Sequence, residues 1–281
     1  MFQVYEPIVL TGSGAPELQT ICEKLGLSEH RMSYYAVRSA ALGPVAAEVV
    51  SATFYHHPVE MVSRAIPLAW SIASPERIVA ARFEAVDQAL RRLLPQQFES
   101  AEIVEAVELV REAMVGCSIA GRPLFAAHAA LPWPSEPHVA LWHGLNLFRE
   151  HRGEGHTSAV MAARLTPAQT APLLIAATGE ARENRAWRWP DDVWNQAVAE
   201  LQERGWLDDA GGLTNDGLAA RTRIEDETDG LALGPWLQLG EERTHRLWTL
   251  LRDLLQVILD QNGLARLRTP IGLSWPAQWP G

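Results

Sequence analysis

Residues 141–160, LWHGLNLFREHRGEGHTSAV, hold the densest group of titratable side chains in the chain, and the interpretation of its fold starts there. Apolar residues recur in this stretch at helical spacing, at Trp142, Leu145 and Phe148. The spacing predicts an amphipathic helix over about residues 137–151. Glycine tolerates the positive φ of a helix C-terminus, so the Arg-Gly-Glu-Gly of 152–155 predicts that this helix ends there. Thr157 would then cap a second helix.

Polar side chains gather at the predicted turn. His143, Asn146 and Glu150 form a stripe on the first helix, because successive helical residues are rotated by about 100°. His156 would lie beside the positive end of the second helix dipole. With the Arg149 guanidinium, these groups would form a corner suited to acid/base chemistry or to holding an anion. The alternative is the wet face of an amphipathic helix, where surface ion pairs carry little energetic weight.

The composition favours a globular bacterial protein of one large or two medium domains. Of the 281 residues, 47% are hydrophobic, and the formal net charge is −10. Lys24 is the only lysine among 24 basic residues, which together with abundant alanine points to a high-GC bacterial proteome. The two cysteines form neither a disulfide framework nor a CxxC metal motif. No apolar run approaches the length of a membrane span, and the first residues lack a charged signal region. We therefore expect a cytoplasmic protein.

Residues 1–164 are expected to form a helical domain that holds a ligand pocket. Residues 1–13 read as a short apolar arm, extended up to its Thr-Gly-Ser-Gly end. A later helix ends in Phe-Tyr-His-His-Pro, and Pro58 pushes its neighbour out of helical conformation. Because adjacent residues point in different directions, we expect at most one of His56 and His57 to face a given pocket. His128 is predicted to be a packed or hydrogen-bonded core histidine.

Residues 165–239 are expected to form a winged-helix domain. Thr166 caps one helix, Pro190-Asp191-Asp192 starts another, and a glycine turn after Gly205 predicts a β-hairpin wing before the Thr214 cap. A last helix at 240–262 is apolar over more than half its circumference. Such a helix either crosses a core or joins two subunits, and we expect a homodimer. Residues 263–281 are predicted to be an extended tail.

Several phrases carry a family resemblance. The phrase AVAELQERGWLDDAGGLTNDGLAARTRIEDETD resembles the winged-helix domain of MarR-type regulators. The run from YYAVRSAALG through GRPLFAAHAALPWP, LWHGLNLFREHRGEGH and LTNDG…IEDETD resembles an actinobacterial helix-turn-helix family sometimes labelled SalK-like. The resemblance covers about residues 30–240. It implies a helical N-terminal domain fused to a winged helix in a protein of bacterial secondary metabolism, and it transfers no catalytic residue.

The charge of the predicted winged helix argues against nucleic acid as a partner. Residues 166–230 carry six arginines and thirteen acidic residues, a net charge of −7. Phosphate attraction supplies most non-specific affinity for DNA, so an acidic face repels it. We therefore interpret this unit as a structural or dimerisation module. A ligand-responsive winged-helix regulator remains the alternative.

Familiar motifs for other chemistries are missing from the sequence. GxGxxG, GxxxxGK[ST], GxSxG and HExxH do not occur, so no cofactor is expected. His151 and His156 lie five residues apart, and not four apart as in an HxxxH pair on one helix face. Because Glu150 and His143 could add ligands, a His/Glu metal-dependent enzyme is a further alternative. What remains is an aromatic-rich pocket for a small molecule, with catalysis left open. The candidate ligand-binding residues are Tyr34, Arg38, Tyr55, His56, His57, Trp70, Arg149 and His156. The candidate acid/base residues are His143, Glu150 and His151.

Overall fold

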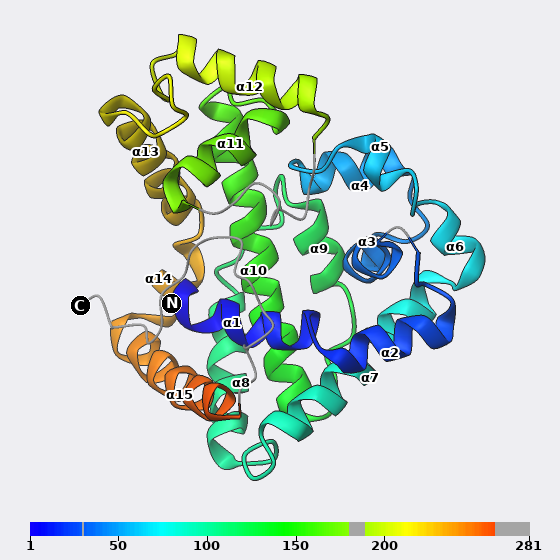
Figure 1. The fold of residues 1–281 in the computed structure, drawn as a ribbon. Coiled ribbons are helices and arrows are strands. Elements are labelled where there is room, and N and C mark those ends of the chain that lie inside the picture. Colours follow the sequence, from blue (N-terminus) through cyan, green and yellow to red (C-terminus); the bar gives the residue numbers. More distant parts are fainter. Residues whose placement is uncertain (30, 180–188, 262–281) are drawn as a thin grey trace.

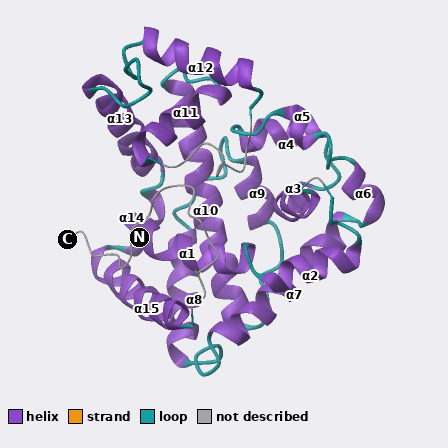
Figure 2. Ribbon diagram, in the orientation of Figure 1, coloured by secondary structure: helices purple, strands orange, loops and turns teal. Residues whose placement is uncertain are grey.

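The computed structural model describes residues 1–29, 31–179 and 189–261, and nearly all of their regular structure is helical (Figure 1). No strand is present among these residues, and Figure 2 shows helices and loops alone. The mainly α fold predicted from the sequence is therefore confirmed. The expectations for residues 263–281 lie outside the described residues.

In chain order the elements are α1 (Phe2–Ser13), α2 (Pro16–Leu25), α3 (Met32–Ser39), the 3₁₀ turn η1 (Ala40–Leu42), α4 (Ala47–Phe54), α5 (Val59–Val62), α6 (Leu68–Ile72), α7 (Pro75–Leu93), α8 (Ala101–Met114), α9 (Pro123–Ala129), α10 (Pro137–Ala162), α11 (Pro167–Thr178), α12 (Asp191–Glu203), α13 (Asn215–Leu231), α14 (Gly234–Leu239) and α15 (Glu241–Asp260).

Helix α10 runs unbroken through the middle of the molecule, so the helix end predicted at 152–155 is wrong. Neither Gly153 nor Gly155 adopts a positive φ. A Cβ at Gly155 would lie 3.3 Å from the Leu231 Cβ, and one at Gly144 would lie 2.4 Å from a Val110 methyl. At Gly144 and Gly155 the missing side chain lets α8 and α13 approach α10 closely; it does not end the helix. His156 consequently lies within a helix and not at the start of one.

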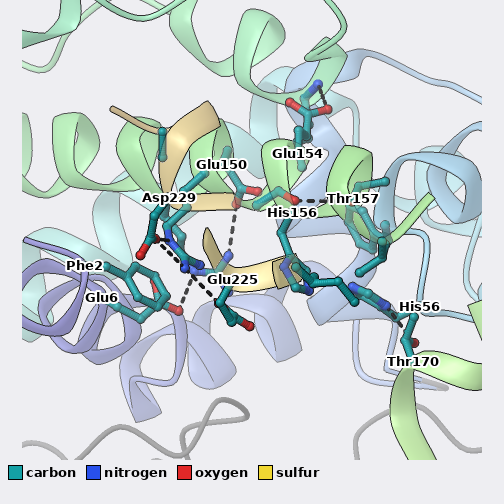
Figure 3. A pocket seen from close by; sticks show the side chains of 18 of the residues that line it. Phe2, Glu6, His56, Glu150, Glu154, His156, Thr157, Thr170, Glu225 and Asp229 are labelled. Carbon is teal, nitrogen blue, oxygen red and sulfur yellow. Dashed lines mark hydrogen bonds and ion pairs between the residues drawn. The ribbon is translucent and has the colours of Figure 1, made fainter. Parts of the chain in front are cut away.

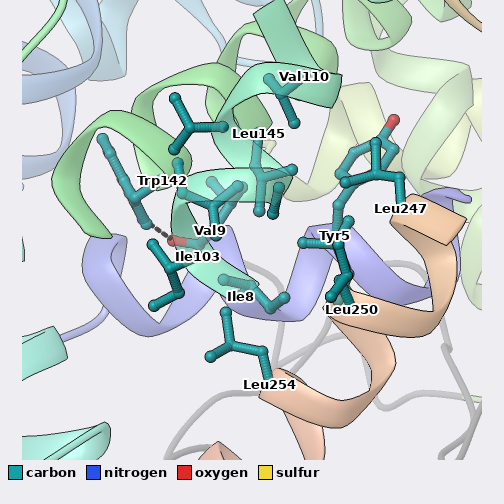
Figure 4. Packing of buried hydrophobic residues seen from close by; sticks show 14 of the residues in the cluster. Tyr5, Ile8, Val9, Ile103, Val110, Trp142, Leu145, Leu247, Leu250 and Leu254 are labelled. Carbon is teal, nitrogen blue, oxygen red and sulfur yellow. Dashed lines mark hydrogen bonds between the residues drawn. The ribbon is translucent and has the colours of Figure 1, made fainter. Parts of the chain in front are cut away.

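Helix α1 replaces the extended arm expected for residues 1–13. It packs between α10 and α15, and most of its residues are buried although Pro7 lies inside it (Figure 1). The Trp142 indole N–H donates to the Val9 carbonyl at 3.0 Å, as Figure 4 shows. A Cβ at Gly12 would lie only 2.5 Å from that indole nitrogen. Close packing against α10 therefore holds α1 in a helical form that its proline disfavours.

Helix α15 completes the same core. Leu247, Leu251, Leu255 and Ile258 are fully or almost fully buried against α1 and α8. Figure 4 shows Leu247, Leu250 and Leu254 of the same helix packed beside α1. The apolar faces from which the homodimer was predicted are thus covered largely within one chain. Of the two alternatives that the sequence allowed for this helix, packing in a core and joining two subunits, the structure shows the first. The apolar surface of α15 therefore no longer argues for a dimer.

A second core lies among α2 to α7 at the other end of the molecule. Leu27, Tyr35, Val50 and Ile66 are buried there, together with Ile78 of the long helix α7. This core holds α3 and α4 in place, and both helices contribute residues to a cavity that α10 also lines.

The C-terminal helices form a third core. Leu173 of α11, Leu201 of α12 and Ile224 of α13 meet Ala159 and Val160 at the end of α10. Because α10 supplies part of this core, helices α11 to α13 pack directly against the N-terminal part of the chain.

The predicted β-hairpin wing is not formed. Within the described residues, Leu207 and Leu213 make one isolated antiparallel bridge. The Asp208 carboxylate accepts hydrogen bonds from the backbone N–H groups of Ala210 and Gly212, at 2.9 and 2.8 Å. A side chain therefore takes the backbone donors that a longer ladder would use.

No helix in the described part of the chain has the length and apolar character needed to cross a membrane.

Candidate functional site

A cavity of about 800 Å³ lies between the N-terminal helices and the C-terminal helices α11 and α13. Helices α1, α3, α10, α11 and α13 all contribute to its wall, together with the corner after α4 and residues of α14 and α15. Figure 3 shows side chains from these distant segments turned towards one another. Small-molecule sites in proteins have volumes of about 300 to 1,000 Å³, so the cavity is large enough for an organic ligand.

One side of the cavity is an ionic wall formed by Glu6, Arg38, Arg149 and Glu150. Arg38 donates to both Glu150 oxygens, from Nη2 at 2.7 Å and from Nε at 3.3 Å. Arg149 donates from Nη1 to Glu150 at 3.1 Å and from Nε to Glu6 at 3.0 Å. The result is a chain of alternating charge from α1 through α10 to α3.

The wall keeps its charges. Burial by itself would raise the pKa of Glu150, but the positive charges of Arg38 and Arg149 outweigh burial and hold that pKa well below its usual range. Burial would lower the pKa of Arg38, and the Glu150 charge raises it above its ordinary value instead. A carboxylate held in this way takes up no proton near neutral pH. The prediction that Glu150 orients or performs an acid/base step therefore gains no support from its surroundings.

Beside the ionic wall, the cavity is lined by two histidines from the corner after α4. Tyr55 has a φ of 56°, and this sharp bend turns both neighbouring imidazoles into the wall. The expectation that at most one of His56 and His57 faces the pocket is therefore wrong. His57 Nδ1 lies 3.0 Å from the Tyr35 hydroxyl, and His56 Nδ1 lies 2.9 Å from the Thr170 hydroxyl of α11.

His156 lies across from His56, with 6.1 Å between their ring centroids. Its Nδ1 is 3.1 Å from the Thr228 hydroxyl of α13. Burial, followed by the charges of Arg152 and Arg221, lowers the pKa of His156 to about 4. Burial, followed by His156 and Arg38, lowers the pKa of His56 to about 3. Both imidazoles are therefore neutral hydrogen-bonding groups near neutral pH.

A third group of charges joins α10 to α13. Arg152 pairs with Glu225 at 3.1 Å and with Asp229 at 3.0 Å. Its guanidinium also lies 4.1 Å from the Phe2 ring centroid. The Asp229 side chain is mostly exposed, so this pairing lies towards solvent, whereas the ionic wall is buried.

The structure brings most of the predicted ligand-binding residues into one wall. Those that line the cavity are Tyr34, Arg38, His56, His57, Arg149 and His156, and the acid/base candidate Glu150 lines it with them. They come from α3, the corner after α4, and α10. Their convergence is a property of the fold, because no two of these segments are adjacent in the sequence.

Four predicted residues lie outside this wall. His143 packs between Phe83 and Trp133, and His151 packs on Phe125. The remaining two make hydrogen bonds elsewhere, from the Tyr55 hydroxyl to the Leu165 carbonyl and from the Trp70 indole to the Val45 carbonyl. The predicted acid/base pairs of Glu150 with His143 or His151 are therefore not assembled. His143 lies on the same stripe of α10 but two turns, about 10 Å, from Glu150, and His151, the next residue after Glu150, points in another direction.

The polar stripe on α10 is buried and is not a wet face. His143, Asn146 and Glu150 are each about 1% exposed. Arg82 donates to Asn146 at 2.8 Å and contacts His128, which itself lies 3.0 Å from the Arg38 carbonyl oxygen. His128 is thus the hydrogen-bonded core histidine that was predicted. The stripe joins the interior polar groups to the back of the ionic wall.

Some wall residues were not anticipated. Glu6 had been placed in an extended arm, and Arg221, Trp236 and Trp248 lie far along the chain. One local signal was available for Glu6, because a single carboxylate in the apolar run MFQVYEPIVL is unusual and needs a partner if it is buried. Nothing local connects Trp236 or Trp248 to the residues of α10.

The donor set does not favour a metal. Among the described residues, no three or more histidine, cysteine or acidic side chains are grouped so that they could hold an ion. The carboxylates Glu6 and Glu150 are engaged by arginines. The alternative of a His/Glu metal-dependent enzyme therefore gains no support from the described residues.

Comparison with known proteins gives one match. A family model described as a helix-turn-helix family matches residues 1–265. No curated protein and no solved structure matches the chain significantly.

Proposed function

The chain belongs to a helix-turn-helix family, and on that premise we propose that it binds a small organic molecule in its cavity. This cavity lies between the N-terminal helices and the helices α11 to α13, to which we assign the helix-turn-helix part. The cavity is the observation that carries the proposal. Its volume of about 800 Å³ suits a ligand of drug-like size. Aromatic side chains of Phe2, Trp236 and Trp248 line it beside the ionic wall, the mixture typical of small-molecule sites.

Binding is better supported than catalysis. A general base needs a pKa near the working pH, and the pKa values of His56 and His156 are lowered far below that range by burial. Glu150 is engaged by two guanidiniums. The neutral imidazoles remain suited to hydrogen bonding with a ligand, and that is the role we assign to them.

A second candidate function is a ligand-responsive regulator. The observation that favours it is that α11 and α13 contribute Thr170, Leu173 and Ile224 to the cavity wall. A ligand there would touch both the N-terminal helices and the helix-turn-helix part. Any difference in its affinity for two arrangements of these parts would shift their equilibrium.

The surface of α12 weighs against DNA as the partner in that second function. Asp191, Asp192 and Glu203 are exposed on this helix. The guanidinium of Arg204, at its end, donates to the backbone carbonyls of Ala163 and Arg164. Since an acidic surface repels phosphate, we expect no DNA binding by α12.

The first function is tested with a fluorescent apolar probe, N-phenyl-1-naphthylamine, titrated into the purified protein. Thr157 lines the cavity on α10, so Thr157→Trp should fill part of it and weaken probe binding about tenfold or more. Met161 is 58% exposed on the same helix and is absent from the wall, so Met161→Trp is the matched control and should leave binding unchanged. Equal affinity of the probe for the Thr157→Trp variant and the unmodified protein would refute the cavity as the binding site.

The second function is tested by fluorescence anisotropy with labelled DNA fragments from the protein's own genome. Sequence-specific binding that responds to the cavity probe would support the regulator. Absence of binding at physiological salt is the result we expect.

A further inference from the structure

The ionic wall is polarised towards the cavity. The side chains of Glu6 and Glu150 are only 3% and 2% exposed, whereas those of Arg149 and Arg38 are each 22% exposed. The guanidiniums therefore face the cavity, and the carboxylates lie behind them in the protein interior. Although the four charges cancel formally, a molecule in the cavity meets the positive groups first.

The guanidiniums also have hydrogen-bond donors to spare. Each arginine side chain carries five N–H groups. Arg38 makes three hydrogen bonds, to both oxygens of Glu150 and to the Tyr34 hydroxyl. Arg149 makes two, to Glu6 and to Glu150. About half of the N–H groups of this pair are thus left for a ligand or for water.

Neighbouring groups restrict how these donors point. The Arg38 guanidinium carbon lies 4.4 Å from the Phe54 ring centroid. With one face of the guanidinium against an aromatic ring, its remaining donors lie along its edge. A planar or tetrahedral oxyanion accepts two such edge N–H groups at once, which is the strongest geometry available to arginine.

The carboxylates in the wall do not offer an equivalent site for a cation. Both oxygens of Glu150 accept from arginines. The Glu6 Oε2 atom has no hydrogen-bond partner among the described residues, but it is closed off from solvent. Glu154 accepts from the backbone N–H groups of Leu124 and Phe125 at the start of α9, at 2.9 and 2.8 Å. Figure 3 shows its carboxylate turned away from the labelled residues of the other walls.

The geometry points to an organic oxyanion, such as a carboxylate, on an apolar ring-containing body as the ligand of this cavity. The oxyanion would lie on the free N–H edges of Arg149 and Arg38. The apolar body would lie towards Phe2, Trp236 and Trp248 on the adjoining wall. This inference rests on the proposed function, because it names the class of molecule that the same cavity takes.

A matched pair of probes tests the assignment. 8-Anilinonaphthalene-1-sulfonate carries an oxyanion on the same ring body that N-phenyl-1-naphthylamine presents without charge. Charge-assisted hydrogen bonds are about twice as strong as neutral ones. Arg149→Met should therefore weaken binding of the sulfonate about tenfold or more and change binding of the neutral probe less than about twofold. Arg91→Met is the control for surface ion pairing, because Arg91 is a partly exposed arginine outside the cavity.

Arg149→Met leaves Glu6 buried without its arginine and could impair folding. The double variant Glu6→Gln/Arg149→Met removes both charges of the pair, and circular dichroism verifies its helical content. The double variant should show the same selective loss of sulfonate binding. An equal loss of both probes, or no loss of either, would overturn the oxyanion assignment.

The two proposals fail in different ways. If Thr157→Trp leaves both probes bound as before, the cavity is not the binding site and the proposed function fails. If Thr157→Trp weakens both probes while Arg149→Met spares the sulfonate, the cavity binds small molecules and only the oxyanion assignment fails.

Discussion

Glu150 is the residue whose replacement tests the ionic wall most directly. It is about 1% exposed and accepts three hydrogen bonds, two from Arg38 and one from Arg149. Glu150→Gln preserves the shape of the side chain but removes its charge and one acceptor oxygen. Arg38 then loses the one carboxylate that it contacts among the described residues, whereas Arg149 keeps Glu6.

The expected loss of stability follows from that burial. Breaking a buried ion pair by removing one partner costs about 3 to 5 kcal/mol, because the remaining charge stays desolvated. The glutamine oxygen can still accept one hydrogen bond from Arg38, so we expect the lower end of that range, about 3 kcal/mol. This is a large share of the roughly 5 to 15 kcal/mol that stabilises a typical domain.

Urea unfolding followed by circular dichroism measures this effect. Glu225→Gln is the matched control: Glu225 lines the same cavity and pairs with Arg152, but its side chain is 37% exposed. Exposed pairs contribute about 0 to 1 kcal/mol, so the control should unfold close to the unmodified protein. A loss of less than about 1 kcal/mol for Glu150→Gln, or equal losses for the two variants, would refute the buried ionic wall.

Four further predictions concern α10 and the buried histidines. Gly144→Ala should destabilise the protein by about 1 to 3 kcal/mol, because the new methyl group would lie 2.4 Å from Val110. Gly153→Ala should stabilise the protein by about 0.5 to 1 kcal/mol, since nothing lies within 4 Å of the added Cβ and the helix continues there. The urea midpoints of the two variants check both predictions. A destabilising Gly153→Ala would indicate that the helix ends at this glycine after all. His143→Leu should leave probe binding unchanged and the free energy of unfolding within about 1 kcal/mol of the unmodified protein. The reason is that the imidazole packs on rings and its buried Nε2 has no partner among the described residues. A selective loss of probe binding would show that His143 takes part in the site. Burial lowers the pKa of six histidines below 6.5, their ordinary value. Between about pH 6.5 and 4 the unfolded chain therefore binds more protons than the folded chain. The free energy of unfolding should consequently fall as the pH falls through this range. The loss should be about 1 kcal/mol per histidine between pH 6.5 and 5.5, and pH-independent urea midpoints over that interval would contradict it. The six residues are His56, His57, His128, His143, His151 and His156.

The parts of the fold that could be predicted depend on local signals. Ser74, Ser100 and Thr214 each accept a hydrogen bond from a backbone N–H in the first turn of the helix that follows. Their caps act within four residues of sequence, so the helix starts could be found without knowledge of the fold. The spacing of apolar residues in α15 likewise predicted the whole helix, because its period depends on the helix alone.

The errors occurred where a distant contact decides between two local possibilities. A glycine serves a helix end or a close helix contact equally well, and at Gly155 the deciding contact is Leu231, far along the chain. Pro7 favours an interruption, and the packing of α1 between α10 and α15 overrides it. The apolar surface of α15 was correctly predicted, but the sequence could not say whether α1 or a second copy of the chain would cover it.

The same reasoning explains why the site was only half visible in the sequence. Glu150 was recognised as part of a polar stripe on its helix, yet its partner Arg38 on α3 is 112 residues away. A charged residue in a helix that is covered on all sides must find a partner of opposite charge, since burial without one is too costly. Glu6 meets the same condition in a second apolar stretch, and Arg149 connects the two carboxylates. Pairing isolated charges from separate apolar runs would therefore have linked α1 to α10, whereas the search for motifs within one run led to His143 and His151, whose imidazoles pack on aromatic rings instead.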